Sequence, residues 1–290
     1  MPKFKENKRD IEIISEIKAI RAKIQAWKQQ NLAVGFVPTM GALHIGHASL
    51  IKKARDLCDR VIVSIFVNPA QFGPNEDYNR YPRQMEKDRE ICLNNQADII
   101  FAPTIQEIYP DNTDLTSISV PDSLKNKLCG ISRKDHFDGV ATVVVKLLNI
   151  IQPDKAFFGQ KDAQQLIIIK KICHDLNLSS EIVGCPIIRD WDGLACSSRN
   201  AYLSPESRNK ALSLFKTLKK VEELYKNSLK SKDEALIDAK EYLHPDVILE
   251  YFDVYNIDTL EPEDILRTNL LVAIAAKVDE VRLIDNIVLE

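Results

Sequence analysis

The sequence predicts an α/β protein in which a parallel, doubly wound sheet is followed by a smaller α+β domain. Short apolar segments of strand length alternate with segments of helical periodicity as far as Ile188. Polar, glycine-containing turns follow several of these strands, and ligands of such sheets bind at the carboxyl ends of the strands. After Pro205 the pattern changes to charged helices and longer apolar segments.

Each element of the first part is justified by its period and its boundaries. The expected strands are short apolar runs between turn residues, at 34–37, 60–67, 99–102, 155–158 and 181–188. The expected helices have apolar residues at helical spacing, at 11–29, 48–58, 83–94, 140–151 and 164–176. Segment 140–151 is apolar throughout and is assigned to a buried helix, because it is longer than a typical strand.

The second part is expected to form its own small domain. Two charged helices are predicted at 206–229 and 231–243, and strands at 247–257 and 270–278 precede a last apolar stretch at 281–289. We place the domains at 1–188 and 189–290, joined near 189–204. The second domain has no cluster of catalytic character, so its expected role is to cover the site or to form a dimer.

Composition excludes several classes of protein. The 290 residues carry a net charge of −3, which argues against a nucleic-acid-binding surface. The six cysteines are scattered without metal-site spacing, as in a protein with reduced thiols. Residues 1–8 are charged and lack the apolar core of a signal peptide, and no apolar run is long enough to span a membrane. We therefore expect a cytoplasmic protein.

The most informative motif lies between the first expected strand and its helix. His44 and His47 are three residues apart beside Gly41 and Gly46, so both imidazoles fall on one face of a helical turn. Glycines allow a close approach of the backbone, and the start of a helix attracts anions. This arrangement suits a triphosphate. A surface turn or half of a metal site is the alternative, but no further Cys/His cluster completes a zinc site.

Two later strands also end in polar side chains. Asn68 and Gln71 can donate and accept hydrogen bonds, which suits a small hydroxy acid, although Asn68 before proline could simply form a turn. Lys161 could bind phosphate, and Asp162 a ribose hydroxyl or Mg²⁺; a solvated charge and a helix N-cap are the alternatives. Asp88 is expected to be exposed in a charged helix, and a carboxylate that faces Mg²⁺ is the alternative.

A polar loop with two hydroxyls and a guanidinium follows the last strand of the series. Ser197, Ser198 and Arg199 could form a mobile clamp for a leaving pyrophosphate, and the alternative is an interdomain linker. His136 could line the site or have a structural role. Segment 78–83 is expected to be a loop, and the sequence alone assigns no chemistry to it.

Five segments together resemble the pantoate–β-alanine ligase family: PTMGALHIGH (38–47), VSIFVNPAQF (63–72), HFDGVATVV (136–144), FFGQKDAQQL (157–166) and GLACSSRNAYL (193–203). The resemblance implies a Rossmann-like fold of the nucleotidyltransferase superfamily that contains the HIGH motif. It also implies an ATP- and Mg²⁺-dependent reaction through pantoyl adenylate, with release of pyrophosphate and AMP, in a homodimer. The metal ligands are not assigned.

The resemblance also implies roles for individual residues. His44, His47 and Lys161 would act on the phosphates, with His47 as a proton donor. Gln71, Gln165 and Asn68 would bind pantoate, and Gln71 would also reach β-alanine. Contacts with ATP would come from Met40, Gly41, Ala42, Leu43, His44, Ile45, Gly46, His47, Gly159, Gln160, Lys161, Asp162, Ile188, Cys196, Ser197, Ser198 and Arg199.

Three positions depart from the family pattern. Ile45 replaces a frequent acidic residue, Cys196 replaces methionine or leucine, and Lys134-Asp135 replaces Pro-Gly, which puts the local turn in question. Two rival functions are another nucleotidyltransferase with the HIGH motif and a non-catalytic nucleotide- or RNA-binding module. The first has no use for the Asn68, Gln71 and Gln165 amides, and the acidic balance opposes the second.

Overall fold

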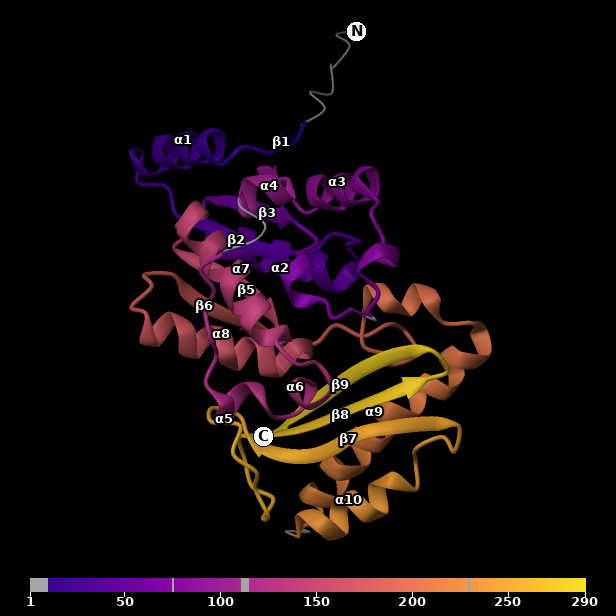
Figure 1. Ribbon diagram of the computed structural model, residues 1–290. Helices are drawn as coiled ribbons and strands as arrows, with labels where there is room; N and C mark the ends of the chain where they lie inside the picture. The colour runs from indigo at the N-terminus through magenta and orange to yellow at the C-terminus, as the bar shows by residue number, and fades with distance from the viewer. Residues whose placement is uncertain (1–9, 75, 111–114, 229–230) are drawn as a thin grey trace, which may run out of the picture.

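Two sheets of different kinds organise the chain. A computed structural model describes residues 10–290 apart from 75, 111–114 and 229–230. Figure 1 shows a parallel sheet in the upper half and a three-stranded antiparallel sheet with helices α9 and α10 in the lower half. Both expected fold types are therefore present, whereas the domain boundary near residue 188 stays a prediction.

The larger sheet is parallel throughout, with strand order β1-β4-β3-β2-β5-β6. Its strands are β1 (Glu12–Ile14), β2 (Val34–Thr39), β3 (Arg60–Ile65), β4 (Ile99–Phe101), β5 (Lys155–Gly159) and β6 (Glu181–Cys185). From β2 the chain first builds outward through β3 and β4, and later returns to place β5 on the other side of β2. The β2/β5 boundary is therefore the topological switch point, where ligands of such sheets bind.

Helices cover both faces of this sheet. One face packs against α1 (Ile17–Lys28), α7 (His136–Ile151) and α8 (Ala163–Asp175), and the other against α2 (Ile45–Leu57) and α3 (Met85–Asn94). Neighbouring strand residues divide between the two cores: Phe36 and Phe158 belong to the first, Val37 and Phe157 to the second. This alternation explains why the strands are apolar throughout.

The antiparallel sheet consists of β7 (Val247–Asn256), β8 (Leu270–Val278) and β9 (Val281–Leu289). Its core includes apolar residues of α9 (Pro205–Lys226) and α10 (Lys232–Lys240). A further apolar cluster joins residues of this sheet with residues of α7 and α8. Short α-helices are also present among the described residues: α4 (Ile105–Ile108), α5 (Asp122–Lys125) and α6 (Cys129–Ser132).

Some expected boundaries are wrong. The expected helix 11–29 begins only at Ile17, because the segment before it forms β1 and pairs with β4. Ile11 and Ile14 have helical spacing, but their burial beside the sheet decides the conformation. Strand β6 ends at Cys185 because Pro186 cannot donate to a ladder. The expected helix end at 229 lies outside the described residues.

Three other expectations, on membrane helices, the N-terminal segment and the cysteines, have different outcomes. Across the part of the chain that the structure describes, no helix is long and apolar enough to cross a membrane. The prediction about the charged segment 1–8 lies outside the described residues. All six cysteines are buried and free, as the scattered spacing indicated.

Candidate functional site

A large cavity lies at the switch point of the parallel sheet. It holds about 1380 Å³ of space, part of it open to solvent, and is lined by residues that follow the carboxyl ends of β2 and β5. Such a volume accommodates a nucleotide beside a small acid. The turn after β2 supplies His44 and His47, and the turn after β5 supplies Lys161 and Asp162.

The two imidazoles are held in one orientation by the start of α2. The His44 Nδ1 accepts a hydrogen bond from the backbone N–H of Gly46 at 3.1 Å, and the His47 Nδ1 accepts one from the His44 N–H at 3.3 Å. The ring centroids are 4.1 Å apart. A neutral ring that accepts at Nδ1 carries its proton at Nε2. Each histidine of the motif therefore offers one Nε2–H donor.

Burial keeps these rings neutral. Burial, followed by the positive charge of Lys161, lowers the pKa of His44 to about 4. Burial and then the neighbouring His44 hold the pKa of His47 well below the usual 6.5. At neutral pH the pair can therefore stabilise developing negative charge by donating hydrogen bonds as neutral groups.

Asp88 supports the same turn, and the expectation of an exposed side chain is wrong. Its carboxylate is 1 % exposed and accepts hydrogen bonds from the backbone N–H groups of Ala42, at 3.0 Å, and Leu43, at 2.7 Å. The turn needs this support because Gly41 and Ala42 have φ values of 81° and 51°. Helix α3 thus carries an inward-facing carboxylate that fixes the turn before the histidines.

The amide residues gather on the other side of the cavity. Asn68 forms the expected turn, and its role in binding a hydroxy acid stays a prediction. Asn68 caps the 3₁₀ turn Pro69–Gln71, yet its side chain is 1 % exposed and donates to the Gln71 Oε1 at 3.0 Å. Gln165 from α8 lines the same cavity. The turn and the amide cluster are therefore one structure.

The turn after β5 is held by a residue from the far end of the chain. The side-chain Nδ2 of Asn286 donates to the backbone carbonyls of Gln160, at 2.9 Å, and Lys161, at 3.0 Å. Lys161 Nζ lies 3.8 Å from the carboxylate of Asp162. Asp162 occupies the N-cap position of α8, but its side chain makes no capping hydrogen bond. Its carboxylate therefore remains available to the cavity.

Segment 196–199 closes another side of the cavity, where the clamp was expected. The Arg199 guanidinium is paired with Asp77 through Nε at 3.0 Å and Nη2 at 2.9 Å. The Tyr81 hydroxyl lies 3.1 Å from the Ser198 Oγ, and Tyr81, from the segment 78–83 to which the sequence assigned no chemistry, also lines the cavity. The Cys196 thiol donates to Asp190 at 3.2 Å, and burial, followed by that hydrogen bond, raises its pKa to about 12.

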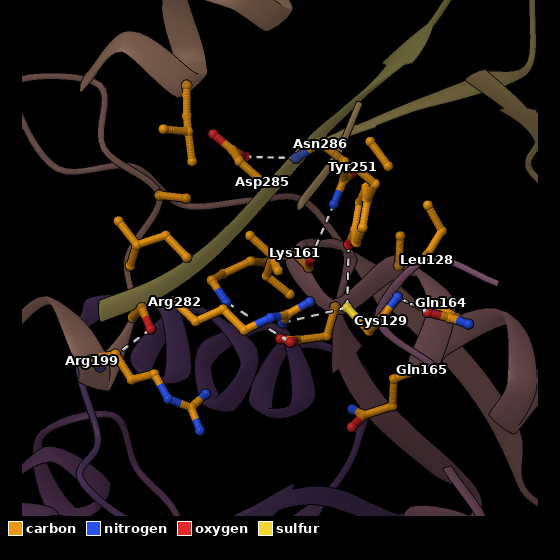
Figure 2. Close-up of a pocket in the computed structure, with 18 of the residues that line it drawn as sticks. Leu128, Cys129, Lys161, Gln164, Gln165, Arg199, Tyr251, Arg282, Asp285 and Asn286 are labelled. Atoms are coloured by element: carbon orange, nitrogen blue, oxygen red, sulfur yellow. Dashed lines mark hydrogen bonds and ion pairs between the residues drawn. The ribbon is translucent and has the colours of Figure 1, made fainter. Parts of the chain in front are cut away.

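A second lobe of the cavity extends to the antiparallel sheet. Figure 2 shows Lys161, Gln165 and Arg199 facing this lobe together with Arg282 and Asn286 of β9. The C-terminal sheet therefore forms a wall of the site, consistent with the expectation that it covers the site. Its polar side chains were not singled out in the sequence because they alternate with apolar residues of an ordinary strand.

Most predicted site residues come together in the cavity. Those that line it are Met40, His44, Gly46, His47, Asn68, Gln71, Gly159, Lys161, Asp162, Gln165, Ile188, Cys196, Ser197, Ser198 and Arg199. The others, Gly41, Ala42, Leu43, Ile45 and Gln160, are absent from its lining as the structure describes it. Ile45 is 55 % exposed, whereas Ala42 and Leu43 are buried. Binding of ATP by these residues stays a prediction.

The segment with the Lys134-Asp135 departure forms a turn before α7. Asp135 adopts a left-handed conformation with φ 61°, which glycine adopts easily and aspartate tolerates. Helix α7 then begins at His136, whose ring lines the cavity. Its Nδ1 lies 2.8 Å from the carbonyl oxygen of Gln71. His136 therefore both lines the site and supports its structure.

The residues present do not form a metal cage. No group of three His, Cys, Asp or Glu side chains within the described ranges could hold an ion. Asp162 is the one carboxylate among the described residues that line the larger lobe. Mg²⁺ commonly keeps several waters and binds through one carboxylate and substrate phosphates, so this donor set fits an ion that arrives with ATP.

The fold and this site define the class of protein. A parallel sheet with paired histidines at one side of its switch point and a lysine turn at the other is a nucleotidyltransferase-type fold. A model of the pantoate-beta-alanine ligase family matches residues 12–288. The chain belongs to this family, whose members form pantothenate from pantoate and β-alanine.

Individual relatives agree over nearly the whole chain. The pantothenate synthetase of Clostridium botulinum (strain Loch Maree) is 49 % identical over 94 % of this chain and 98 % of its own. The structure of the Thermus thermophilus enzyme has a TM-score of 0.91 at 40 % identity, covering 96 % and 99 % of the two chains. The Francisella tularensis enzyme, complexed with "Beta-gamma ATP and Beta-alanine", has a TM-score of 0.78 at 35 % identity, covering 96 % and 97 %. These findings support ATP as the co-substrate.

Proposed function

We propose that this chain condenses pantoate with β-alanine in two steps within the switch-point cavity. A pantoate carboxylate oxygen attacks the α-phosphorus of ATP, which forms pantoyl adenylate and releases pyrophosphate. The β-alanine amine then attacks the acyl carbon, the bond to AMP breaks, and a proton leaves the nitrogen. A carboxylate is unreactive toward amines, whereas the mixed anhydride carries a good leaving group.

The single observation that supports this proposal most is the convergence of donors from opposite sides of the cavity. Two Nε2–H groups come from the α2 side, and the Lys161 ammonium comes from the β5 side. We propose that these groups stabilise charge on the phosphates, with Ser197, Ser198 and Arg199 holding the leaving pyrophosphate. Catalysis then depends on alignment and charge stabilisation rather than on a covalent nucleophile.

The amide side is proposed to bind the acyl substrate. Gln71 and Gln165 hold pantoate, Asn68 supports Gln71, and Gln71 also reaches β-alanine. Asp162 would hold Mg²⁺ that enters with ATP, and the ion would supply charge neutralisation there. Homodimerisation and a cytoplasmic location remain predictions based on the family resemblance and the composition.

Product release tests this function directly. Pyrophosphate should appear only when ATP, Mg²⁺ and pantoate are all present, and AMP should additionally require β-alanine. His47→Ala and Lys161→Ala should stay folded and lose pyrophosphate release, whereas Lys52→Ala, on the exposed face of α2, should not. Wild-type rates in either site variant would remove that residue from the catalytic set. Absence of both products from folded wild-type protein would contradict the function.

A further inference from the structure

The side-chain amide of Gln71 can be oriented without ambiguity. Asn68 Oδ1 accepts hydrogen bonds from the backbone N–H of Ala70, at 3.3 Å, and from the Tyr109 hydroxyl, at 2.8 Å. A backbone N–H can only donate, so this end of the Asn68 amide is the oxygen. The other end, Nδ2, donates to Gln71 Oε1 at 3.0 Å. The Gln71 Nε2 therefore faces Met40 Sδ, 3.3 Å away, and the cavity that both residues line.

The backbone of Gln71 is held from the opposite direction. His136 Nε2 lies 2.8 Å from Arg133 Nη1, and a guanidinium can only donate. The Nε2 must therefore accept, which leaves the proton of the neutral ring on Nδ1. This Nδ1–H donates to the Gln71 carbonyl oxygen at 2.8 Å. Burial, followed by the charge of Arg133, lowers the pKa of His136 to about 4, so the ring is neutral at pH 7.

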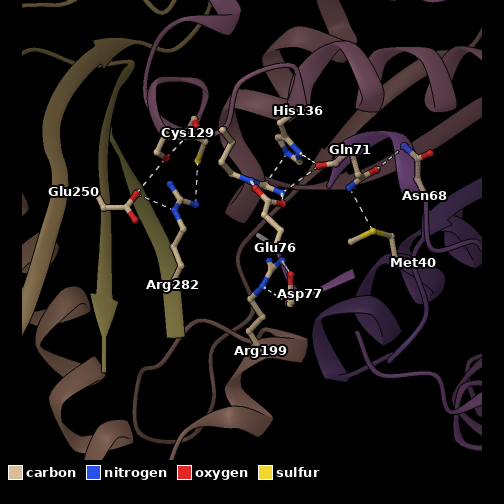
Figure 3. A network of polar contacts seen from close by, with 12 residues as sticks. Met40, Asn68, Gln71, Glu76, Asp77, Cys129, His136, Arg199, Glu250 and Arg282 are labelled. Carbon is tan, nitrogen blue, oxygen red and sulfur yellow. Dashed lines mark hydrogen bonds and ion pairs between the residues drawn. The ribbon is translucent and has the colours of Figure 1, made fainter. Parts of the chain in front are cut away.

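Arg133 is in turn fixed by Glu76. The Nε and Nη2 groups of Arg133 lie 2.7 Å and 2.5 Å from the two carboxylate oxygens of Glu76. Burial favours a higher pKa for Glu76, but the hydrogen bonds and charge of Arg133 outweigh it and hold the pKa below its usual range. Figure 3 shows the connected contacts from Glu76 through His136 to Gln71, Asn68 and Met40.

We propose that His136, locked by Arg133 as the Nδ1–H tautomer, is a positioning residue: it holds the backbone of Gln71 so that the side-chain Nε2, oriented by Asn68, meets the acyl substrate as a donor-only contact. The substrate atom that meets Gln71 is then an acceptor, namely a carboxylate or hydroxyl oxygen of pantoate. This inference rests on the proposed function, because it takes Gln71 as a pantoate ligand. His136 itself acts through Gln71.

The tautomer can be observed directly in the wild-type protein. Long-range ¹H–¹⁵N correlation spectra of the ¹⁵N-labelled protein at pH 7 should show the His136 proton on Nδ1 and an unprotonated Nε2. In free histidine no arginine is present to fix the proton on Nδ1, so this tautomer at His136 would reflect the contact with Arg133. A signal from the Nε2–H tautomer, or from a doubly protonated ring, would overturn the proposal whatever the variants do.

Kinetics then separate positioning from general support of the fold. His136→Phe keeps a ring but removes the donor, so the KM for pantoate should rise about tenfold or more while the KM for ATP changes less than twofold. His136→Asn places an amide N–H close to the Nδ1 position and should restore most of the loss. His174→Phe, at an exposed position on α8, is the matched control and should leave both values unchanged.

The outcomes distinguish the inference from the function beneath it. Equal rises in both KM values, or failure of His136→Asn to rescue, would assign His136 a merely structural role and overturn the inference. Gln71→Ala tests the proposed pantoate site separately. An unchanged KM for pantoate in Gln71→Ala would contradict the proposed pantoate site itself, and with it the basis of the inference.

Discussion

At the residue scale, the hydrogen bond and the burial of His44 determine its protonation state and the atom that it offers to a ligand. Its Nδ1 is committed to a backbone N–H, so the ring meets a ligand only through Nε2. A pKa of about 4, caused first by burial and then by Lys161, makes this group a neutral donor in the free protein. The resemblance gives His47 a proton-donor role, and its pKa is also well below 6.5. Literal proton donation by either ring therefore requires that bound phosphates first raise its pKa.

This argument predicts two titrations of His44. In the free protein an NMR titration should show a midpoint near pH 4, and the midpoint should rise when ATP binds, because nearby anionic oxygens favour the imidazolium. The His signals can be assigned by comparison with His44→Gln. A midpoint near 6.5 without ligand would contradict the buried, neutral ring.

The same shift has a consequence for stability. The unfolded chain binds a proton near pH 6.5 and the folded His44 only near pH 4, so the unfolded state binds more protons between these values. The contribution of His44 to the free energy of unfolding is therefore complete above pH 6.5 and declines as the pH falls toward 4. Urea unfolding of wild type and His44→Gln at pH 7 and pH 5 should show a smaller pH effect in the variant.

At the element scale, the sequence correctly predicts those helices and strands whose conformation is decided by the local pattern of apolar and turn residues. Apolar period and turn residues correctly placed five strands of the parallel sheet, and the strand–turn–helix pattern located His44, His47 and Lys161 at its carboxyl edge. Strand β1 was missed because three residues are too few to show a period, and its conformation is decided by pairing with β4. Asp88 was misjudged because its partner Leu43 lies 45 residues away.

Helix α3 supplies a prediction at this scale. Asp88→Asn replaces one carboxylate oxygen with an NH₂ group, which would face the backbone N–H of Ala42 or Leu43 donor to donor. Leaving such a buried group without an acceptor costs about 1–3 kcal/mol. The free energy of unfolding in urea should fall by that amount, and the KM for ATP should rise because the turn carrying His44 loosens.

Glu86→Gln is the matched control for Asp88→Asn. Glu86 lies in the same first turn of α3 but is exposed, so the same change of carboxylate to amide should alter neither stability nor the KM for ATP. An Asp88→Asn protein with wild-type stability and kinetics would show that the observed hydrogen bonds do not hold the turn.

At the scale of the whole molecule, the second sheet completes the site of the first. Asp285 of β9 pairs with Arg189 at 2.6 Å, and Asn286 holds the turn that carries Lys161. Sequence reasoning anticipated a covering domain but none of these contacts, because 126 residues separate Asn286 from Gln160. Only the folded arrangement brings the two segments together.

This arrangement predicts that a C-terminal substitution weakens nucleotide binding. Asn286→Leu removes both donors, leaves the carbonyls of Gln160 and Lys161 without their partner, and should cost about 1–3 kcal/mol of stability. We expect the KM for ATP to rise about tenfold, which corresponds to ~1.4 kcal/mol, with a smaller change for pantoate. Lys277→Ala, exposed on β8, controls for substitutions in the same sheet. Equal changes in both KM values would show that β9 supports the fold as a whole rather than the Lys161 turn.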